Sequence, residues 1–301
     1  MLATRRADTV VVRAPAKVNL FLEVIAKRPD GYHDLITFMV AVGLFDVLEF
    51  REEPGGAVRL TCDDPSLSVG EDNLVWRAAD VFRRRTGIAR GVHIHLRKRI
   101  PLAAGLGGGS SDAAATLKGL NWLWQADRSA GELAELGAAL GSDVPFFFAL
   151  PAAWCMGRGE RVEPYPLRRP LNVVLACPPA GLSTAAVYRG VTVPANPVTP
   201  EPLRRALEDG RAEAIGRELF NRLQPVAEGL CPEVAALRRL FATIAPAGHA
   251  LSGSGSAYFA LARTRRDAHR LARLVRREYD GPGLRVVVTR TIPTEVLGTE
   301  Y

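Results

Sequence analysis

Short runs of β-branched and aromatic residues fill most of the first 62 positions of the chain. Gly, Pro and Asp separate these runs, which is the pattern of strands joined by turns. We therefore predict that the chain begins with a sheet. The expected strands are TVVVRA, KVNLFLEVI, YHDLITFMVAV, DVLEF and AVRLTC.

Helical signals follow the expected sheet. Asp72 and Asn73 can cap a helix that ends at Gly87, and apolar residues recur at helical spacing from Ala113 to Trp124. This pattern predicts that helices pack with one apolar face against the sheet. The expected elements are a helix over 73–85, a strand over 91–99, a helix after residue 110 and a helix over 129–140 that ends at Gly141.

Strands and helices alternate in the second half of the chain, which is punctuated by proline-rich segments. The interleaving predicts an α+β fold with an N-terminal domain over residues 1–160 and a C-terminal domain over residues 161–301. The expected strands are 171–177, 249–253, 257–263 and 284–291, and the expected helices are 202–220, 232–243 and 265–278.

Composition narrows the class of protein. A chain of 301 residues, 48% of them hydrophobic, can bury the cores of two domains. No apolar stretch approaches the roughly 20 residues of a membrane helix, and the first residues lack a cleavage-like end. We therefore expect a cytoplasmic protein with no membrane partner. The four cysteines lie far apart, so neither a disulfide framework nor a thiolate metal site is indicated.

The chain is basic, with a net charge of +7. Arginine dominates, and only four of the 39 basic residues are lysine, namely Lys17, Lys27, Lys98 and Lys118. The basic residues are scattered rather than gathered in a block, which favours small anionic substrates over nucleic acid. A basic nucleic-acid-binding module is the alternative from a different class, and its affinity would fall steeply with salt.

The run PLAAGLGGGSSDAAA at 101–115 places four glycines directly before an expected helix. Glycine tolerates positive φ and close approach of a ligand, so successive N–H groups can surround a phosphate. The run lacks the signatures of a Walker A loop and of a dinucleotide loop. A tight turn is the plain alternative. The expected polyphosphate site comprises Pro101, Leu102, Ala103, Ala104, Gly105, Leu106, Gly107, Gly108, Gly109, Ser110 and Ser111.

Two further segments carry candidate chemistry. Asp143 stands in Gly-Ser-Asp-Val-Pro before three phenylalanines, so it is either a turn residue or a partly desolvated acid that faces a cleft. Gly253, Ser254 and Gly255 lie between two expected strands. They form either a simple hairpin or a second set of phosphate-binding N–H groups.

Seven segments, taken in order, resemble the GHMP kinases, the superfamily of galactokinase, homoserine kinase and mevalonate kinase. The resemblance implies an N-terminal domain with a left-handed βαβ unit, a ferredoxin-like C-terminal domain and an active site between them. It also implies ATP as co-substrate and Mg²⁺ as metal ion. The segments are APAKVNLFLEV (14–24), RPDGYHDL (28–35), EDNLV (71–75), the glycine loop, GSDVPFFF (141–148), GLSTAAVY (181–188) and LSGSGSAYFAL (251–261).

The triple glycine followed by Ser-Ser-Asp, combined with Tyr32-His33, is most similar to one branch of this superfamily. Its acceptor is a diphosphocytidyl polyol, phosphorylated at the 2-hydroxyl in the non-mevalonate route to isoprenoid precursors. The resemblance implies that Tyr32 and Tyr188 stack on the cytosine ring and that His33 hydrogen-bonds its edge. Asn19 and Thr184 would lie near the acceptor. A GHMP kinase of homoserine or mevalonate type is the alternative.

The same resemblance implies which residues carry phosphoryl transfer. Asp143 would accept the proton of the acceptor hydroxyl, and Lys17 would keep that carboxylate ionised. Asn73 and Lys98 would lie at the adenosine end. The loop over 253–255 would contact substrate phosphates through its N–H groups.

Three properties stay unassigned by the sequence. No motif identifies the Mg²⁺ ligands, because Ser110 or Ser111 could supply only a hydroxyl and Asp112 can simply complement a helix dipole. The segment Asn221-Arg222-Leu223-Gln224 has basic and amide residues where the family pattern leads us to expect Asp and Glu, so no role is assigned to it. The oligomeric state is not predicted either.

Overall fold

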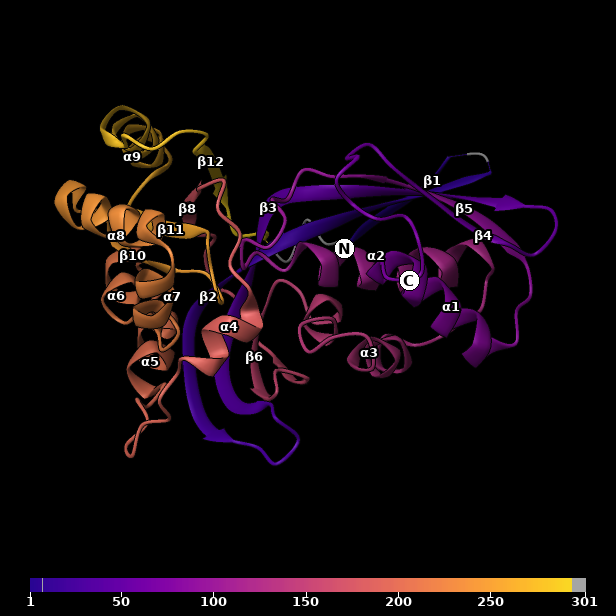
Figure 1. The fold of residues 1–301 in the computed structure, drawn as a ribbon, viewed down its shortest axis with the longest axis horizontal. Helices are drawn as coiled ribbons and strands as arrows, with labels where there is room; N and C mark the ends of the chain where they lie inside the picture. Colours follow the sequence, from indigo (N-terminus) through magenta and orange to yellow (C-terminus); the bar gives the residue numbers. More distant parts are fainter. Residues whose placement is uncertain (7, 294–301) are drawn as a thin grey trace.

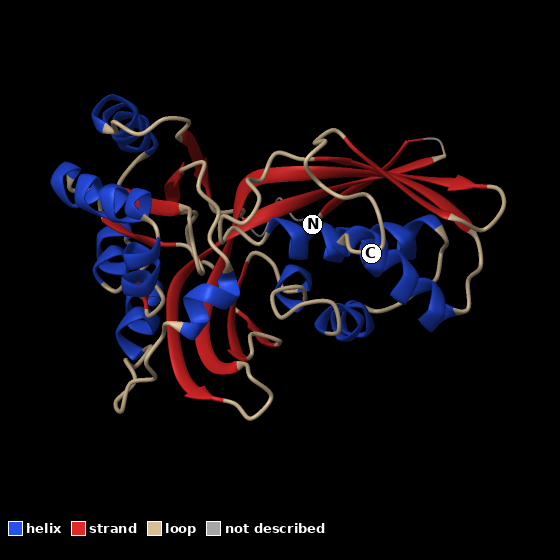
Figure 2. Ribbon diagram, viewed as in Figure 1, coloured by secondary structure: helices blue, strands red, loops and turns tan. Residues whose placement is uncertain are grey.

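The computed structural model describes residues 1–6 and 8–293, and its strands form two sheets (Figures 1 and 2). The larger sheet has eight strands in the order β1-β2-β3-β5-β4, with β6 added beside β3, β7 beside β6 and β9 beside β2. Its strands are β1 Leu2–Arg6, β2 Thr9–Lys27, β3 His33–Glu53, β4 Val58–Cys62, β5 Gly91–Arg97, β6 Ala152–Gly157, β7 Arg161–Pro164 and β9 Phe220–Asn221.

Strands β2 and β3 are each much longer than predicted. Pro15 and Gly43 divide the expected runs, yet each strand continues through them. The antiparallel pairing shifts register between Pro15 and Ala16, as it does at two further points along β2. Such a bulge tolerates proline, because it interrupts the hydrogen-bond ladder locally. The predicted breaks were therefore wrong, and one long hairpin runs from one half of the molecule into the other (Figure 1).

Three helices cover one face of the larger sheet (Figure 2). They are α1 Leu74–Thr86, α2 Gly108–Leu123 and α3 Ala130–Ala138, and the short 3₁₀ helix Pro145–Phe148 follows them. The predicted signals for α1 are confirmed. The Asn73 side chain accepts a hydrogen bond from the Val75 N–H at its start, and Gly87 ends it in the left-handed conformation with φ of 72°. A core of alanine, leucine and aromatic side chains lies between α1, α2 and the sheet.

The smaller sheet is antiparallel throughout, in the order β10-β11-β8-β12. Its strands are β8 Asn172–Cys177, β10 Gly248–Leu251, β11 Tyr258–Ala262 and β12 Arg285–Arg290. Alternate residues of β8 and β11 pack in opposite directions. One set packs under α8 Pro232–Ile244 and α9 Arg265–Glu278, and the other, including Val173 and Phe259, joins the core beside β2 and β3.

The remaining helices are α4 Thr184–Arg189, α5 Glu201–Asp209, α6 Ala212–Arg217 and α7 Gln224–Leu230. The single helix predicted over 202–220 was wrong, because Gly210 adopts φ of 71° and separates α5 from α6. Strands β6 and β7 and helices α4 and α7 were not predicted. No helix within residues 1–6 and 8–293 is long and apolar enough to cross a membrane.

The two halves of the chain are joined by packing as well as by sequence. Strand β9 pairs in parallel with β2, and one hydrophobic cluster combines Ala16 and Val18 with Val173 and Leu175. The larger sheet extends past residue 160, since β7 pairs with β6, and the smaller sheet begins at Asn172. The fold is α+β as predicted, whereas the division at residues 160 and 161 stays a prediction.

Candidate active site

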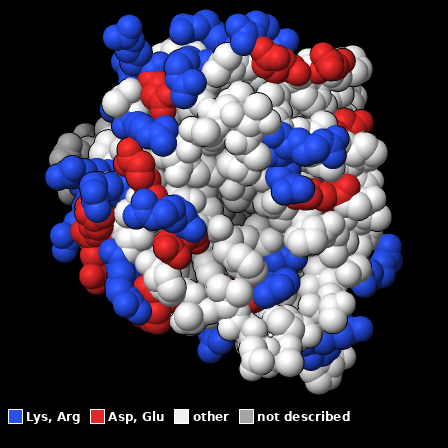
Figure 3. Space-filling model, turned by 90° about the vertical axis from the view of Figure 1, so that its left-hand side faces the viewer, with Lys and Arg blue, Asp and Glu red and all other residues white. Residues whose placement is uncertain are grey.

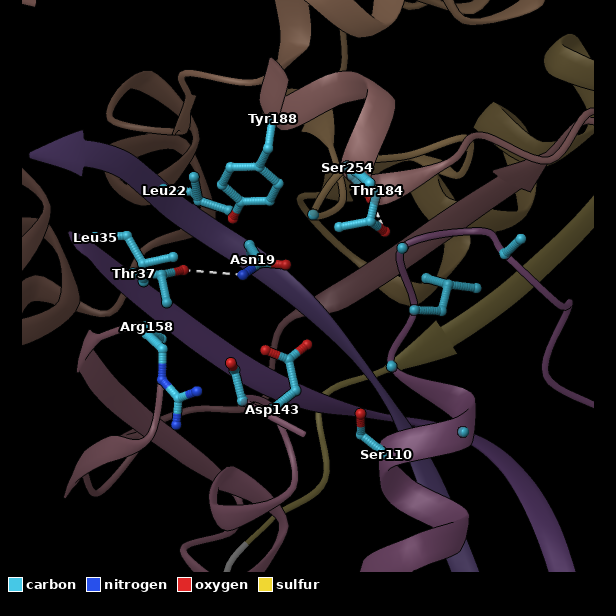
Figure 4. A pocket seen from close by; sticks show the side chains of 18 of the residues that line it. Asn19, Leu22, Leu35, Thr37, Ser110, Asp143, Arg158, Thr184, Tyr188 and Ser254 are labelled. Carbon is cyan, nitrogen blue, oxygen red and sulfur yellow. Dashed lines mark hydrogen bonds between the residues drawn. The ribbon is translucent and has the colours of Figure 1, made fainter. Parts of the chain in front are cut away.

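A cavity of about 1030 Å³ lies between the glycine loop, the β2–β3 hairpin, helix α4 and the loop after β10. In Figure 4, the side chains of Asn19, Asp143 and Tyr188 point into this cavity from three different elements. The volume is at the upper end of the range for small-molecule sites, so it can hold more than one ligand. The residues of the loop over 101–110 line one wall.

The glycine loop adopts a conformation that only glycine accommodates without strain. Gly105 and Gly107 have φ of 72° and 68°, and Gly107 is the N-cap of α2. A Cβ atom on Gly107 would lie 2.9 Å from Cγ of Lys17, and one on Gly105 would lie 2.0 Å from the carbonyl oxygen of Ser252. The loop is therefore packed against both Lys17 and the second glycine loop, and it leads directly into the first turn of α2.

Lys17 and Asp143 meet beside this loop. The Lys17 Nζ atom lies 3.4 Å from Oδ2 of Asp143 and donates a hydrogen bond of 2.7 Å to Oδ1 of Asn19. The Asn19 amide in turn donates to Thr37 Oγ1 at 2.9 Å, as the dashed line in Figure 4 shows. The side chain of Lys17 is 4% exposed and that of Asp143 is 35% exposed. A fixed cation thus faces a carboxylate that solvent and ligands can reach.

The second glycine loop closes the cavity from the C-terminal half. Ser254 Oγ and Thr184 Oγ1 lie 2.9 Å apart, which joins the loop to α4. Ser252 Oγ donates a hydrogen bond of 3.0 Å to the carbonyl of Gly105, which joins the two glycine loops. Gly253 has φ of 54°, and a Cβ atom there would lie 3.1 Å from Nζ of Lys17. The second glycine loop is therefore the turn between β10 and β11, and it also forms part of the cavity wall.

Aromatic side chains line the far end of the cavity. The rings of His33 and Tyr188 are stacked, with their centroids 5.4 Å apart and their planes at 29°. Tyr32 is 53% exposed, and the Arg158 guanidinium lies over its ring at 5.0 Å. Burial, together with the positive charge of Lys27, lowers the pKa of His33. The imidazole is therefore neutral near pH 7 and has both a donor and an acceptor nitrogen.

Lys98 lies in the wall of the cavity, but its amine is committed to two buried carboxylates. The Lys98 Nζ atom donates to Asp46 at 2.5 Å and to Asp112 at 2.8 Å. Asp46 also accepts from the backbone N–H groups of Arg99 and Ile100, at the start of the glycine loop. Burial raises the pKa of Asp112 to about 8, and the neighbouring Lys98 opposes that shift.

Asp112 does not have the role beside the helix dipole that its sequence position suggested. The helix has no acidic residue in its first turn, and Asp112 is a buried hydrogen-bond partner of Lys98 rather than a complement to the helix dipole. Within the described residues, no group of three or more His, Cys, Asp or Glu side chains is placed to hold a metal ion. These residues therefore do not fit a protein-held Mg²⁺ cage.

Most of the predicted site residues line this one cavity. Three do not, namely Asn73, Ser111 and Gly255. The Asn73 amide caps α1 and donates to the Ser68 carbonyl at 2.6 Å, and the buried Ser111 hydroxyl has no hydrogen-bond partner among the described residues. The predicted residues that do line it are Lys17, Asn19, Tyr32, His33, Lys98, Asp143, Thr184, Tyr188, Gly253, Ser254 and the loop residues from Pro101 to Ser110.

Sequence reasoning missed several residues that line the cavity, among them Thr37, Arg158, Arg189 and Lys27. Lys27 had a signal, because it is one of four lysines in an arginine-rich chain and three of those four lie in the cavity wall. Thr37 and Arg158 had none, because only the pairing of β3 with β2 and β6 brings them to the site.

Comparison with known proteins agrees with this geometry. The chain matches "GHMP kinases N terminal domain" over residues 73–149 and "GHMP kinases C terminal" over residues 203–281. It is 41% identical over 284 residues to a "4-diphosphocytidyl-2-C-methyl-D-erythritol kinase" of Pelotomaculum thermopropionicum, covering 94% of this chain and 98% of the relative. The chain belongs to this family of GHMP kinases.

Further relatives support membership of the 4-diphosphocytidyl-2-C-methyl-D-erythritol kinase family. A protein of the same name from Gloeobacter violaceus is 37% identical, covering 97% of each chain. A solved structure of "4-(cytidine 5'-diphospho)-2C-methyl-D-erythritol kinase" has a TM-score of 0.77 at 36% identity, covering 94% of this chain and 99% of that one. A homoserine kinase of Cytophaga hutchinsonii has a TM-score of 0.74 at 20% identity over 97% of each chain, so it shares the fold alone.

These matches confirm the predicted family, the two-domain GHMP kinase fold and the activity class. The protein is an ATP-dependent small-molecule kinase of the GHMP type. The roles of individual site residues stay predictions.

Proposed function

We propose that the protein transfers the γ-phosphoryl group of ATP to the 2-hydroxyl of 4-diphosphocytidyl-2-C-methyl-D-erythritol in this cavity. The observation that carries the proposal is the Lys17–Asp143 pair, 3.4 Å apart, which lies between the glycine loop on one side and the His33–Tyr188 stack on the other. A phosphate-binding loop and a base-binding end in one cavity suit a nucleotide donor and a nucleotide-linked acceptor.

Direct transfer accounts for each group at the centre of the cavity. Asp143 accepts the proton of the acceptor hydroxyl while the hydroxyl oxygen attacks the γ-phosphorus of ATP, and the bond from that phosphorus to the bridging oxygen breaks to release ADP. Lys17 faces Asp143 at 3.4 Å and also faces the negative charge that develops on the transferred group. Asn19 holds the Lys17 amine in place through its 2.7 Å hydrogen bond.

The aromatic end accounts for the diphosphocytidyl moiety. A cytosine ring is flat and weakly polar, so it binds against an aromatic face such as that of Tyr188 or Tyr32. The neutral His33 can both donate to and accept from the edge of the base. Lys27, Arg158 and Arg189 line the same end and offer positive charge to the diphosphate.

ATP supplies the anionic charge that the glycine loop accommodates. Mg²⁺ is proposed to enter on the ATP phosphates, because the described residues do not provide a carboxylate cage and Mg²⁺ retains water and phosphate ligands readily. The loop N–H groups and the Ser110 hydroxyl then face the phosphate oxygens. We propose a cytoplasmic location, since the reaction depends on ATP.

We propose a small-molecule acceptor rather than nucleic acid. Figure 3 shows Lys and Arg interspersed with Asp and Glu over the face formed by the C-terminal half. Nucleic-acid-binding surfaces usually gather basic residues in one stripe or patch. On this face the basic residues are therefore not gathered in one patch, in agreement with small anionic substrates.

An acceptor panel tests the proposal. ATP consumption is measured with 4-diphosphocytidyl-2-C-methyl-D-erythritol, with its diphosphouridyl analogue, with homoserine and with mevalonate, and the product is located by phosphorus NMR. We expect turnover with the diphosphocytidyl acceptor and a new monophosphate ester at its 2-position. Faster turnover of homoserine or mevalonate, or phosphorylation at another hydroxyl, would contradict the proposal. Salt-sensitive binding of nucleic acid without ATP turnover would support the rival class.

A further inference from the structure

The segment Asn221–Gln224, which the sequence left without a role, lies against the β2 strand that carries Lys17 and Asn19. Strand β9 pairs in parallel with β2, with Leu22 opposite Asn221. The backbone N–H of Arg222 donates a hydrogen bond of 2.8 Å to the carbonyl of Leu22. A short segment from the C-terminal half is therefore part of the sheet beside the cavity.

Asn221 holds the second glycine loop. Its Nδ2 atom donates to the carbonyl oxygens of Leu251 at 2.9 Å and Gly253 at 2.8 Å, and its Oδ1 accepts from the Leu223 N–H at 2.9 Å. Both amide hydrogens are thus used on one loop, by a side chain that is largely buried. Since Gly253 lies against the Lys17 amine, Asn221 fixes the distance between the loop and that amine.

Arg222 reaches in the opposite direction, to the fully buried Glu23. The two side chains form a bidentate pair, with both nitrogen–oxygen distances at 2.7 Å. Glu23 also accepts the backbone N–H groups of Val24 and Val198, each at 2.8 Å. Burial alone would raise the pKa of Glu23, but the Arg222 guanidinium and the two N–H groups hold the pKa below its usual range.

The hydrogen bond to Val198 extends this network to the acceptor end of the cavity. Val198 belongs to the segment over 190–200 that follows α4, and Val191 and Val193 of that segment line the cavity. They pack beside Tyr188 and Leu22. The position of this wall therefore depends on the Glu23 carboxylate, which Arg222 holds from the segment over 221–224.

We propose that Glu23, Asn221 and Arg222 form a clamp that sets the acceptor wall and the second glycine loop in fixed register with β2. The three residues act as positioning residues, since none of them lines the cavity. Through Glu23 the clamp governs acceptor binding, and through Asn221 it governs alignment beside Lys17. The expected effect of the clamp on acceptor binding, the kinetic form of the inference, rests on the proposed function. Its effect on the positions of the two segments, the structural form of the inference, does not.

The structural form is tested by hydrogen exchange on the free protein. Glu23→Gln and Arg222→Lys remove the bidentate charge pair but keep polar groups in place. We expect amide exchange to accelerate in peptides over 190–200 in both variants, and over 251–256 in Asn221→Ala, while peptides of α1 are unchanged. The matched control is Arg84→Ala, which breaks an exposed ion pair with Asp80 and should alter neither segment. Unchanged exchange in both segments would overturn the clamp.

The kinetic form is tested by separate KM values for the two substrates. A small misplacement of a binding wall can cost up to about a hundredfold, so we expect Glu23→Gln and Arg222→Lys to raise the acceptor KM roughly tenfold. The KM for ATP should change less than about twofold. Asn221→Ala should instead lower kcat. A parallel rise of both KM values would indicate general loosening and contradict the clamp. Absence of wild-type turnover with the diphosphocytidyl acceptor would count against the proposed function alone, because the exchange experiment needs no substrate.

Discussion

Lys17 is a buried cation whose surroundings decide what it can do. Its amine lies 2.7 Å from Oδ1 of Asn19 and 3.4 Å from Oδ2 of Asp143, and Gly253 packs close to it. The backbone N–H of Lys17 donates a hydrogen bond of 2.9 Å to the carbonyl of Leu106. A lysine has three donor hydrogens. The side chain is therefore fixed by strand, loop and carboxylate at once, which is the arrangement that a positioned charge requires.

Substitutions in the Lys17–Asp143 pair test this arrangement. Asp143→Asn removes the proton acceptor and Lys17→Ala removes its cationic partner, so each should lower kcat by roughly a hundredfold or more. The double variant should lose less than the product of the two effects, because both residues serve one proton transfer. Steady-state kinetics measure the effect, and circular dichroism checks folding. Asp209→Asn, at an exposed carboxylate paired with Arg211, is the control and should keep wild-type turnover.

Substitutions at the aromatic end test recognition of cytosine. Each base–aromatic contact is worth about 1–3 kcal/mol, so Tyr188→Ala or Tyr32→Ala should raise the acceptor KM roughly ten- to hundredfold. His33→Ala should also reduce the preference for cytosine over uracil, because a hydrogen bond to the base edge is lost. The KM for ATP serves as the internal control and should barely change. A rise in the ATP KM instead would place the cytidine site elsewhere.

At the scale of elements, local signals predicted where α1 begins and ends better than how far the long strands β2 and β3 continue. Asn73 caps the start of α1 and Gly87 ends it, so the bounds of this helix could be predicted from neighbouring residues alone. The lengths of β2 and β3 depend on pairing across a bulge, which no local pattern reveals. The motif residues of the site could be predicted by resemblance. Glu23 and its partner Arg222 could not, because they are 199 positions apart in the chain.

The glycine loop gives a prediction at this scale. Gly107→Val introduces a β-branched side chain at positive φ and within 2.9 Å of Lys17 Cγ, so the loop must move. We expect ATP binding to be abolished, as measured by calorimetry. Gly229→Ala is the matched control, because a Cβ atom at that helical glycine of α7 meets nothing within 4 Å. Unchanged ATP affinity in the Gly107 variant would mean that the loop is only a turn.

The Lys98 cluster gives a prediction for pH. The pKa of Asp112 is about 8 in the folded protein, against about 3.9 in an unfolded chain, so the folded state holds an extra proton between these values. The free energy of unfolding should therefore fall as pH rises through this window, by up to about 1.4 kcal/mol per pH unit. Asp112→Asn should remove most of that slope.

Urea unfolding from about pH 6 to about pH 9 measures the difference in stability between the wild type and Asp112→Asn. The difference should shift in favour of the variant as pH rises. Asp80→Asn, at a carboxylate paired with Arg84 on α1, is the control and should give a difference that stays level. If the stability difference between Asp112→Asn and the wild type also stays constant with pH, the raised pKa of Asp112 is contradicted.

For the whole molecule, a cavity lined by residues from both halves suits the proposed function, in which both substrates are bound together. Direct transfer between them needs no covalent phosphoenzyme. We therefore expect intersecting initial-rate patterns when ATP and acceptor are varied, and no protein-bound radioactivity after incubation with γ-labelled ATP alone. Parallel lines with a labelled protein would contradict direct transfer.

The hydrophobic cluster that combines Ala16 and Val18 of β2 with Val173 and Leu175 of β8 has a consequence for recombination. Chimeras made with a relative by a crossover near residue 160 would inherit the two sides of this cluster from different parents. Interior packing tolerates mismatched volumes poorly. Functional hybrids should therefore be obtained more readily when the β2–β3 hairpin is exchanged together with the C-terminal half than when the chain is divided once.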